Sequence, residues 1–224
     1  MTTPAVTPAQ VFEVFRSQRL VSVIRAASPE AALGAARAVI RGGMKLVEVT
    51  YSVPDAPAVM RTLAAEAPAG VLIGAGTVLT RAEAVAAVAA GARFLIAPNI
   101  SDDAAAVARE SATFYCPGAY TTNEILHAVA MGAQLVKVYP VGVAGGPDYI
   151  RIIRDPLPNI PLLAAGGTHL DNILPFYAAG CIACGIGGAM ADPALAMAGR
   201  FDDIEARTRA FVERAAAFAP AARS

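Results

Sequence analysis

Eight short apolar runs, each followed by a longer alanine-rich stretch, divide the chain into regular units. The runs have the length and composition of strands and lie at 20–25, 46–51, 71–78, 94–98, 113–117, 135–140, 161–165 and 182–187. The stretches of helical character lie at 29–41, 56–66, 81–90, 101–110, 122–131, 147–154, 170–179 and 193–218. Strands that alternate with single helices predict parallel βαβ units.

The ends of these units carry helix start and stop residues. Ser28-Pro29 and the run Thr121–Glu124 are typical helix starts, and Gly91 and Gly132 are typical helix ends. Eight units without a linker predict a single (β/α)8 TIM-barrel domain over 1–224, with an extra N-terminal helix at about 7–18 covering its bottom. The structural alternative is a doubly wound open sheet. Its first turn is usually glycine-rich, whereas the first turn here reads RAASPE.

Composition and charge exclude several classes of protein. The 224 residues are 56% hydrophobic with a mean hydropathy of +0.51, and 18 basic residues balance 18 acidic ones. A balanced charge without basic blocks argues against nucleic acid as a partner. The N-terminal sequence MTTPAVTPAQ lacks the layout of a signal peptide, and no apolar run reaches the roughly 18 residues of a membrane span. We therefore expect a soluble cytoplasmic protein with no membrane partner.

The three cysteines do not form a disulfide framework. Cys181 and Cys184 form a C-x-x-C pair inside the apolar run AAGCIACGIGG, with no second pair nearby. Buried small apolar side chains are favoured over redox or metal chemistry, because free cysteine is usually a core residue.

Lys137 is the first candidate for chemistry. The chain has sixteen Arg and only two Lys, yet a lysine stands in the middle of the apolar run LVKVYP. Strand alternation puts Lys137 on one face with Leu135 and Tyr139, and Val136 and Val138 on the other. Burial favours the neutral amine, which attacks carbonyl carbons as a guanidinium does not. The pattern supports a Schiff-base lysine about as well as a structural lysine that is paired or reaches solvent.

Glu48 occupies the comparable place in the second run, LVEVTY, on one face with Leu46 and Thr50. A carboxylate and an amine inside one barrel can exchange protons during imine chemistry. The alternative is a salt bridge that only neutralises Lys137. Both interpretations place the two groups at one site.

Further polar residues end other strands, where (β/α)8 barrels carry their sites. Arg25 ends the first run, and its guanidinium can hold a carboxylate by two hydrogen bonds, although an isolated Arg there is more often a surface residue. Thr77 ends the third run, and Pro98 and Asn99 end the fourth. These three residues can shape a pocket or donate hydrogen bonds, but none is diagnostic alone.

Glycine-rich turns follow the seventh and eighth runs and include Gly166, Gly167, Gly187 and Gly188. Loops at these places often cradle phosphate with backbone N–H groups, and glycine permits the close approach this needs, although glycines also serve tight turns. The two histidines, His127 and His169, are far apart and without a carboxylate cluster. We therefore expect no metal and no cofactor.

Taken together, the residues resemble a known family over about 10–218. The chain is similar to the 2-keto-3-deoxy-6-phosphogluconate / 4-hydroxy-2-oxoglutarate aldolases and their 2-keto-3-deoxy-6-phosphogalactonate relatives. The motifs that carry the resemblance are VSVIRAASPEAA, GGMKLVEVTYSVPDA, IGAGTVLT, FLIAPNI, CPGAYTTNE, GAQLVKVYP, GGPDYI and AAGGTHLDN. In this order they are specific, although any one alone is weak.

The resemblance implies a homotrimer of (β/α)8 barrels with metal-free class I chemistry. It makes Lys137 the Schiff-base lysine and Glu48 the general acid/base. It places Arg25 and Thr77 at the pyruvate carboxylate and Pro98-Asn99 at the mouth. Galactonate-type members share the Pro-Asn-Ile found here. The position where one branch has an arginine is Ser52, so the branch with Arg at the end of the first strand is the better match.

The chain departs from the family where a phosphate would bind. The usual serine of the eighth-strand turn is missing from the run Gly187-Gly188-Ala189, and the frequent threonine before Gly166 is Ala165. Backbone N–H groups of Gly166, Gly167, Gly188 and Ala189 can still bind a phosphate.

Three functions therefore stay open. The first is an aldolase that cleaves a 2-keto-3-deoxy-6-phospho sugar acid to pyruvate and glyceraldehyde 3-phosphate. The second is an aldolase for an unphosphorylated 4-hydroxy-2-oxo acid such as 4-hydroxy-2-oxoglutarate. The third is a phosphometabolite-binding barrel, an isomerase or sensor, in which Lys137 is only an electrostatic clamp.

Overall fold

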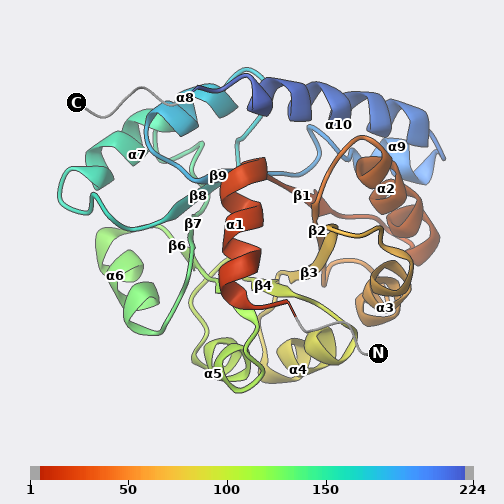
Figure 1. Ribbon diagram of the computed structural model, residues 1–224, viewed down its shortest axis with the longest axis horizontal. Coiled ribbons are helices and arrows are strands. Elements are labelled where there is room, and N and C mark those ends of the chain that lie inside the picture. The colour runs from red at the N-terminus through yellow and green to blue at the C-terminus, as the bar shows by residue number, and fades with distance from the viewer. Residues whose placement is uncertain (1–5, 220–224) are drawn as a thin grey trace.

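The structure is a computed structural model that describes residues 6–219. All strand pairs are parallel, and the helices form a ring outside the sheet (Figure 1). The strands are β1 (Leu20–Ile24), β2 (Leu46–Thr50), β3 (Leu72–Gly76), β4 (Phe94–Ile96), β5 (Phe114–Cys116), β6 (Gly118–Ala119), β7 (Val136–Val138), β8 (Leu162–Ala165) and β9 (Ala183–Ile186). The helices are α1 (Pro8–Gln18), α2 (Pro29–Arg41), α3 (Ala56–Glu66), α4 (Arg81–Ala89), α5 (Asp102–Glu110), α6 (Thr122–Ala130), α7 (Pro147–Arg154), α8 (Ile173–Ala178), α9 (Pro193–Met197) and α10 (Phe201–Ala216). Residues 1–5 and 220–224 of the expected 1–224 domain, including the start of the segment compared with a signal peptide, lie outside the described residues.

The sheet closes into a barrel because its two outermost strands are consecutive parts of one segment. The strand order is β5-β4-β3-β2-β1-β9-β8-β7-β6, and only Pro117 separates β5 from β6. Proline has no N–H to give to a ladder, but the Pro117 carbonyl still accepts from the Lys137 N–H at 2.9 Å. The predicted fifth strand therefore continues to Ala119, and the (β/α)8 barrel predicted from the sequence is confirmed.

Two helices differ from the prediction in extent. The stretch 193–218 forms two helices, α9 and α10, because Gly199 between them adopts a left-handed φ of 68° that a right-handed helix cannot include. The stretch 170–179 becomes helical only at Ile173. Before it, the Asn172 side chain accepts from the His169 N–H at 2.8 Å and closes a separate turn.

Helix starts carry the capping groups that the sequence suggested. The Ser28 hydroxyl accepts from the Ala31 N–H at 3.2 Å, and Thr121 with Glu124 forms a reciprocal capping box. Such caps satisfy N–H groups that have no partner inside the helix, and each contributes about 1 kcal/mol.

The barrel has an apolar interior that α1 closes at the bottom. In Figure 1, α1 (red) crosses the middle of the ring of strands. Its Phe15 is fully buried, stacks on Phe114 with ring centroids 5.2 Å apart, and meets Phe94 edge-on at 5.5 Å. Burying each such ring contributes about 1.5–3 kcal/mol. The bottom of the barrel is therefore filled, and space for a ligand remains at the opposite end.

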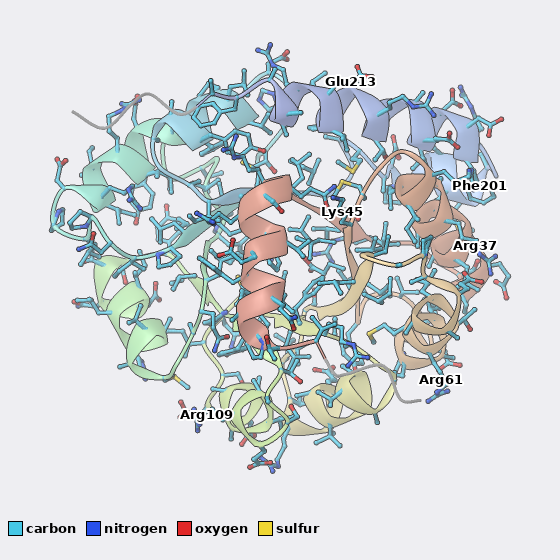
Figure 2. All side chains as sticks on the ribbon, viewed as in Figure 1. Arg37, Lys45, Arg61, Arg109, Phe201 and Glu213 are labelled. Atoms are coloured by element: carbon cyan, nitrogen blue, oxygen red, sulfur yellow. The ribbon has the colours of Figure 1, made fainter. Side chains whose placement is uncertain are left out.

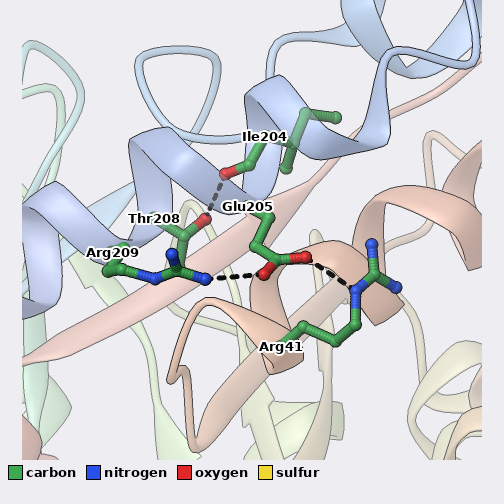
Figure 3. A network of polar contacts seen from close by, with 5 residues as sticks. All are labelled: Arg41, Ile204, Glu205, Thr208 and Arg209. Atoms are coloured by element: carbon green, nitrogen blue, oxygen red, sulfur yellow. Dashed lines mark hydrogen bonds and ion pairs between the residues drawn. The ribbon is translucent and has the colours of Figure 1, made fainter.

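The outer surface is charged and tied together by ion pairs. Arg37, Arg61 and Arg109 project outward from the helical ring (Figure 2). Glu205 of α10 accepts from Arg41 of α2 at 2.7 Å and joins the last long helix to the first of the ring (Figure 3). Among residues 6–219, no helix is both long and apolar enough to cross a membrane.

Candidate active site

A cavity of about 350 Å³ opens at the carboxyl ends of four strands. Residues of β1, β7, β8 and β9 and of the loops that follow them form its walls. Of the residues predicted from the sequence, it brings together Arg25, Lys137, Gly166, Gly167, Gly187 and Gly188. This is the end of the barrel at which the fold places binding and catalytic groups.

Lys137 lies on the inner face of β7. Leu135 belongs to the barrel interior, whereas Val136 and Val138 pack in the layer between strands and helices, as the alternation predicted. Only 6% of Lys137 is exposed, yet it lines the cavity. Its Nζ lies 4.8 Å from the centre of the Tyr139 ring. The amine is therefore shielded from bulk water but reachable by a ligand in the cavity.

Glu48 lies on the inner face of β2 with 1% of its surface exposed. Its Oε1 has no hydrogen-bond partner among the described residues. Burial raises the pKa of the carboxyl, and the charges of Lys137 and Arg25 oppose that rise. A carboxyl with a raised pKa and no fixed partner is suited to take up and release a proton.

Gly76 makes the room that Glu48 occupies. A Cβ at Gly76, at the end of the neighbouring strand β3, would lie 1.9 Å from Glu48 Oε1. Any side chain there would displace the carboxyl, so this glycine determines where Glu48 stands.

A chain of hydroxyls orients Arg25 at the mouth. Its Nη1 donates to the Ser52 hydroxyl at 3.3 Å, and that oxygen lies 2.6 Å from the Thr50 hydroxyl. Thr50 in turn donates to the Ile24 carbonyl at 3.0 Å. The guanidinium keeps further N–H groups for a ligand, and it is the group that binds carboxylates most specifically.

The two glycine loops that line the cavity contain N–H groups without a protein acceptor. Among the described residues, the N–H groups of Gly167, Thr168, Gly188 and Ala189 donate to no protein group, and all four residues line the cavity. The positive φ of Gly166 (78°) and Gly167 (102°) gives the first loop its shape. Such concave sets of N–H groups bind anions.

Four of the predicted site residues do not line this cavity: the buried Glu48, and Thr77, Pro98 and Asn99. Pro98 and Asn99 line a second cavity of about 350 Å³ with Glu124 of α6, and Tyr139 is the residue the two cavities share. Thr77 is half-buried just after β3 with a φ of 59°. Pro98 and Asn99, predicted at the mouth, thus line a different cavity from Lys137, and the two cavities share Tyr139.

Three residues near Lys137 were not singled out from the sequence. Tyr139 and Thr168 line the cavity, and Cys116 is fully buried in the barrel interior. Burial raises the pKa of the Cys116 thiol, while the charge of Lys137 lowers it. The sequence feature that could have identified Thr168 is its place as a polar residue directly after Gly166-Gly167.

The other cysteines and the histidines lie elsewhere. Cys181 and Cys184 are buried in the layer between strands and helices, as expected, and burial raises the pKa of Cys181 to about 12. His127 lies on α6, and His169 is exposed in the loop after β8. No cluster of three His, Cys, Asp or Glu side chains suited to a metal occurs within residues 6–219.

Comparisons with known proteins agree with this geometry. A family model described as KDPG and KHG aldolase matches residues 11–207. The chain is 34% identical over 177 residues to the probable 2-dehydro-3-deoxy-6-phosphogalactonate aldolase of Rhizobium meliloti, covering 79% of this chain and 83% of the relative. It is 32% identical to the 2-dehydro-3-deoxy-phosphogluconate aldolase of Treponema pallidum, covering 88% and 93%.

The fold matches solved structures of the same kind. The KDPG aldolase of Legionella pneumophila, with pyruvate captured as a covalent carbinolamine, superposes with a TM-score of 0.82 at 27% identity over 91% of this chain and 97% of that one. The family model spans most of the chain, including β2, β7 and both glycine loops. The chain belongs to the KDPG and KHG aldolase family.

Proposed function

We propose that this chain is a class I aldolase in which Lys137 forms an imine with the 2-oxo group of its substrate. The proposed reaction cleaves a 2-keto-3-deoxy-6-phospho sugar acid, of the phosphogluconate or phosphogalactonate type, to pyruvate and glyceraldehyde 3-phosphate. The observation that carries the proposal is the buried Lys137 amine at the floor of the cavity, with the buried Glu48 carboxyl in the same barrel. The relatives' names supply the substrate class.

In the first step, the Nζ lone pair of Lys137 attacks carbon 2 of the substrate. The carbonyl oxygen takes a proton, which gives a carbinolamine. The hydroxyl of the carbinolamine then takes a second proton and leaves as water when the imine forms. Glu48 carries these protons, since burial raises the pKa of its carboxyl and so favours the protonated form that can give a proton up.

In the second step, the bond between carbons 3 and 4 breaks. Its electron pair moves to carbon 3 and toward the iminium nitrogen, while the hydroxyl of carbon 4 loses a proton to the base and becomes the aldehyde. Carbon 3 of the resulting enamine then takes up a proton, and water releases pyruvate and the free Lys137 amine. The iminium accepts the electrons, so the reaction needs no metal ion or cofactor. We expect EDTA to leave the turnover rate unchanged, and a loss restored by a divalent cation would contradict the class I mechanism.

The two ends of the substrate are anions, and the cavity offers a donor set for each. Arg25, oriented by Ser52, faces the carboxylate next to carbon 2. The loops of Gly166-Gly167 and Gly187-Gly188 face the phosphate. Thr77 completes the carboxylate end in this proposal, and Pro98 and Asn99 border the approach beyond Tyr139.

The loops of Gly166-Gly167 and Gly187-Gly188, with the residues that follow each, are called the cradle below. Its side chains favour a second substrate class. Ala165 and Ala189 line the cavity there without hydroxyls, and the Thr168 hydroxyl donates to the Gly185 carbonyl. An unphosphorylated 4-hydroxy-2-oxo acid such as 4-hydroxy-2-oxoglutarate would need fewer donors there. We favour the phosphorylated class because four cavity-lining N–H groups have no protein acceptor.

Borohydride trapping tests the imine. Pyruvate and borohydride should attach one reduced pyruvyl group to Lys137, because reduction turns the imine into a stable amine. The internal control is Lys45, the other lysine, which is exposed and precedes β2 at the opposite end of the barrel (Figure 2). A trapped adduct on Lys45 alone, or none, would refute the mechanism and leave an isomerase or sensor that binds phosphometabolites.

A panel of aldols tests the substrate class. The ratio of kcat/KM for the phosphorylated and unphosphorylated compounds measures what the cradle contributes, since both share the pyruvyl end. We expect the 6-phosphorylated compounds to react better. A preference for 4-hydroxy-2-oxoglutarate would select the second class instead.

We also propose a homotrimer located in the cytoplasm. Leu126 and Val129 of α6 and Leu79 and Val85 around α4 are exposed apolar side chains that an interface could cover. Light scattering should give three times the 22.9 kDa chain mass, and a monomer would contradict the assembly. Cell fractionation tests the location.

A further inference from the structure

Thr168 stands between the two halves of the anion cradle. It follows Gly166-Gly167 at the end of β8 and lines the cavity, yet only 8% of it is exposed. Its hydroxyl donates to the carbonyl of Gly185 at 2.5 Å. Gly185 lies on β9, the strand that leads into Gly187-Gly188. One buried side-chain hydrogen bond thus joins the segments that present the free N–H groups.

Each half of the cradle is already held by hydrogen bonds of its own. In the first loop, the Gly166 carbonyl accepts from the Gly142 N–H at 2.7 Å, and the Gly167 carbonyl accepts from Asn172 Nδ2 at 2.8 Å. In the second, the Gly187 carbonyl accepts from the Met190 and Ala191 N–H groups at 2.9 and 3.0 Å. The bonds of Asn172, Met190 and Ala191 lie within their own loops, and the bond of Gly142 ties the first loop to the segment after β7. They do not connect the two loops to each other.

We infer that Thr168 is a positioning residue that sets the spacing of the two loops and thereby the affinity for the phosphate end of the substrate. The hydroxyl of Thr168 has one proton, and it is donated to the Gly185 carbonyl, so the hydroxyl does not donate to the phosphate. Thr168 therefore acts by positioning the two loops of the cradle. Donors held in place before binding lose less freedom when the anion arrives. The inference rests on the proposed function, because it concerns the phosphate-bearing aldol.

The pair Thr168→Val and Thr168→Ser tests it. Valine keeps the shape of threonine and removes the hydroxyl, whereas serine keeps the hydroxyl. A neutral hydrogen bond corresponds to a few-fold to roughly tenfold change in a binding constant. We therefore expect Thr168→Val to raise KM for the 6-phosphorylated aldol about five- to tenfold and to weaken competitive inhibition by inorganic phosphate in parallel. We expect kcat within about twofold of wild type, and Thr168→Ser should restore both constants.

Thr208→Val is the matched control. The Thr208 hydroxyl is also buried and donates to a main-chain carbonyl, that of Ile204 at 2.7 Å, but within α10 and away from the cavity (Figure 3). This variant loses the same kind of hydrogen bond. Its KM and its inhibition by phosphate should therefore equal those of wild type. If Thr168→Val does not fold, Thr168→Ala removes the same hydroxyl with a smaller side chain, and the same comparison is made.

The outcomes separate the inference from the function on which it rests. An unchanged phosphate inhibition constant in Thr168→Val, or a loss that Thr168→Ser does not restore, overturns the role of Thr168 while pyruvate trapping on Lys137 proceeds normally. An equal rise of KM for phosphorylated and unphosphorylated aldols also overturns it, since the effect would then not concern the phosphate. Failure of trapping in the wild type overturns the aldolase proposal itself.

Discussion

Replacing Glu48 with Gln should stabilise the protein while it removes activity. The carboxyl is 1% exposed, and its Oε1 lacks a partner among the described residues. Leaving a buried polar atom unsatisfied costs about 1–3 kcal/mol. The cost is larger for a charged atom, and glutamine keeps the shape while it removes the charge, so we expect a gain of about 1 kcal/mol at neutral pH. For a chain of this size that is a rise in Tm of about 2–4 °C.

The gain should depend on pH in a defined direction. Burial raises the pKa of Glu48 in the folded protein, so the folded state binds the proton more tightly than the unfolded state does. Ionisation therefore destabilises the wild type. The advantage of Glu48→Gln should be small below the unfolded pKa of about 4.3, grow as the pH rises toward the folded pKa, and stay constant above it.

Glu66→Gln is the matched control with the opposite sign. Glu66 is on the surface, where its hydrogen bonds with Arg37 lower the pKa of the carboxyl. Its contribution to stability is present above the unfolded pKa and is lost as the pH falls through the folded value. Glu66→Gln should therefore lower Tm slightly at pH 7 and leave it unchanged at low pH, with an effect below about 1 kcal/mol.

Thermal unfolding of wild type and both variants between pH 3 and 8, together with turnover and exchange of the pyruvate methyl protons, tests the argument. General acid–base catalysis contributes roughly 10²–10⁴-fold, so kcat of Glu48→Gln should fall by that factor and the exchange rate should fall with it. A Tm advantage that does not grow from pH 4 to 8 would refute the electrostatic reasoning. Near wild-type exchange would leave Glu48 a counter-ion without a role in proton transfer.

The remaining predictions concern other parts of the same site. Lys137→Arg should keep the charge but show no reduced pyruvyl adduct by mass spectrometry, because guanidinium forms no imine. Gly188→Ser should lower KM for the phosphorylated aldol and not for the free one, since a Cβ at this position meets nothing closer than 3.8 Å. Gly188→Ala is its control without a hydroxyl, and an equal effect of both would exclude the added donor as the cause. Gly76→Ala should reduce kcat as severely as Glu48→Gln, because the alanine Cβ would lie 1.9 Å from the Glu48 carboxyl and displace it. Unchanged turnover would show that the Glu48 carboxyl can move without loss of activity.

Much of the fold could be predicted because each unit repeats the same local rules. Apolar runs of strand length recur eight times, and capped helix starts and glycine ends, which are also local features, mark several of the helices between them. The break between α9 and α10 was harder to predict, because the segments before and after Gly199 both have compositions that favour helix. The continuation of the fifth strand past Pro117 depends on a carbonyl that pairs with Lys137 on the next strand. Local sequence does not contain that pairing.

The same distinction applies to the site. Lys137 and Glu48 were predictable because an isolated charge within an apolar strand is conspicuous and the alternation fixes its face. That Pro98 and Asn99 line a different cavity from Lys137 could not be predicted, because it depends on the tertiary packing around Tyr139, which both cavities share. Thr168 was missed for a similar reason: its partner Gly185 is 17 residues away, and only the register of β8 with β9 brings the two together.

The cradle that we propose would also explain how a phosphate site can persist while its side chains change. Backbone N–H groups are present whatever the side chain, so the donors of Gly167, Thr168, Gly188 and Ala189 do not depend on residue type. What the sequence must preserve is their direction and spacing. The positive φ of Gly166 and Gly167 preserves the direction. The hydrogen bond from Thr168 to Gly185 preserves the spacing. Hydroxyls at positions 165 and 188 would add donors to a cradle that already exists, so their absence lowers affinity without removing selectivity for an anion.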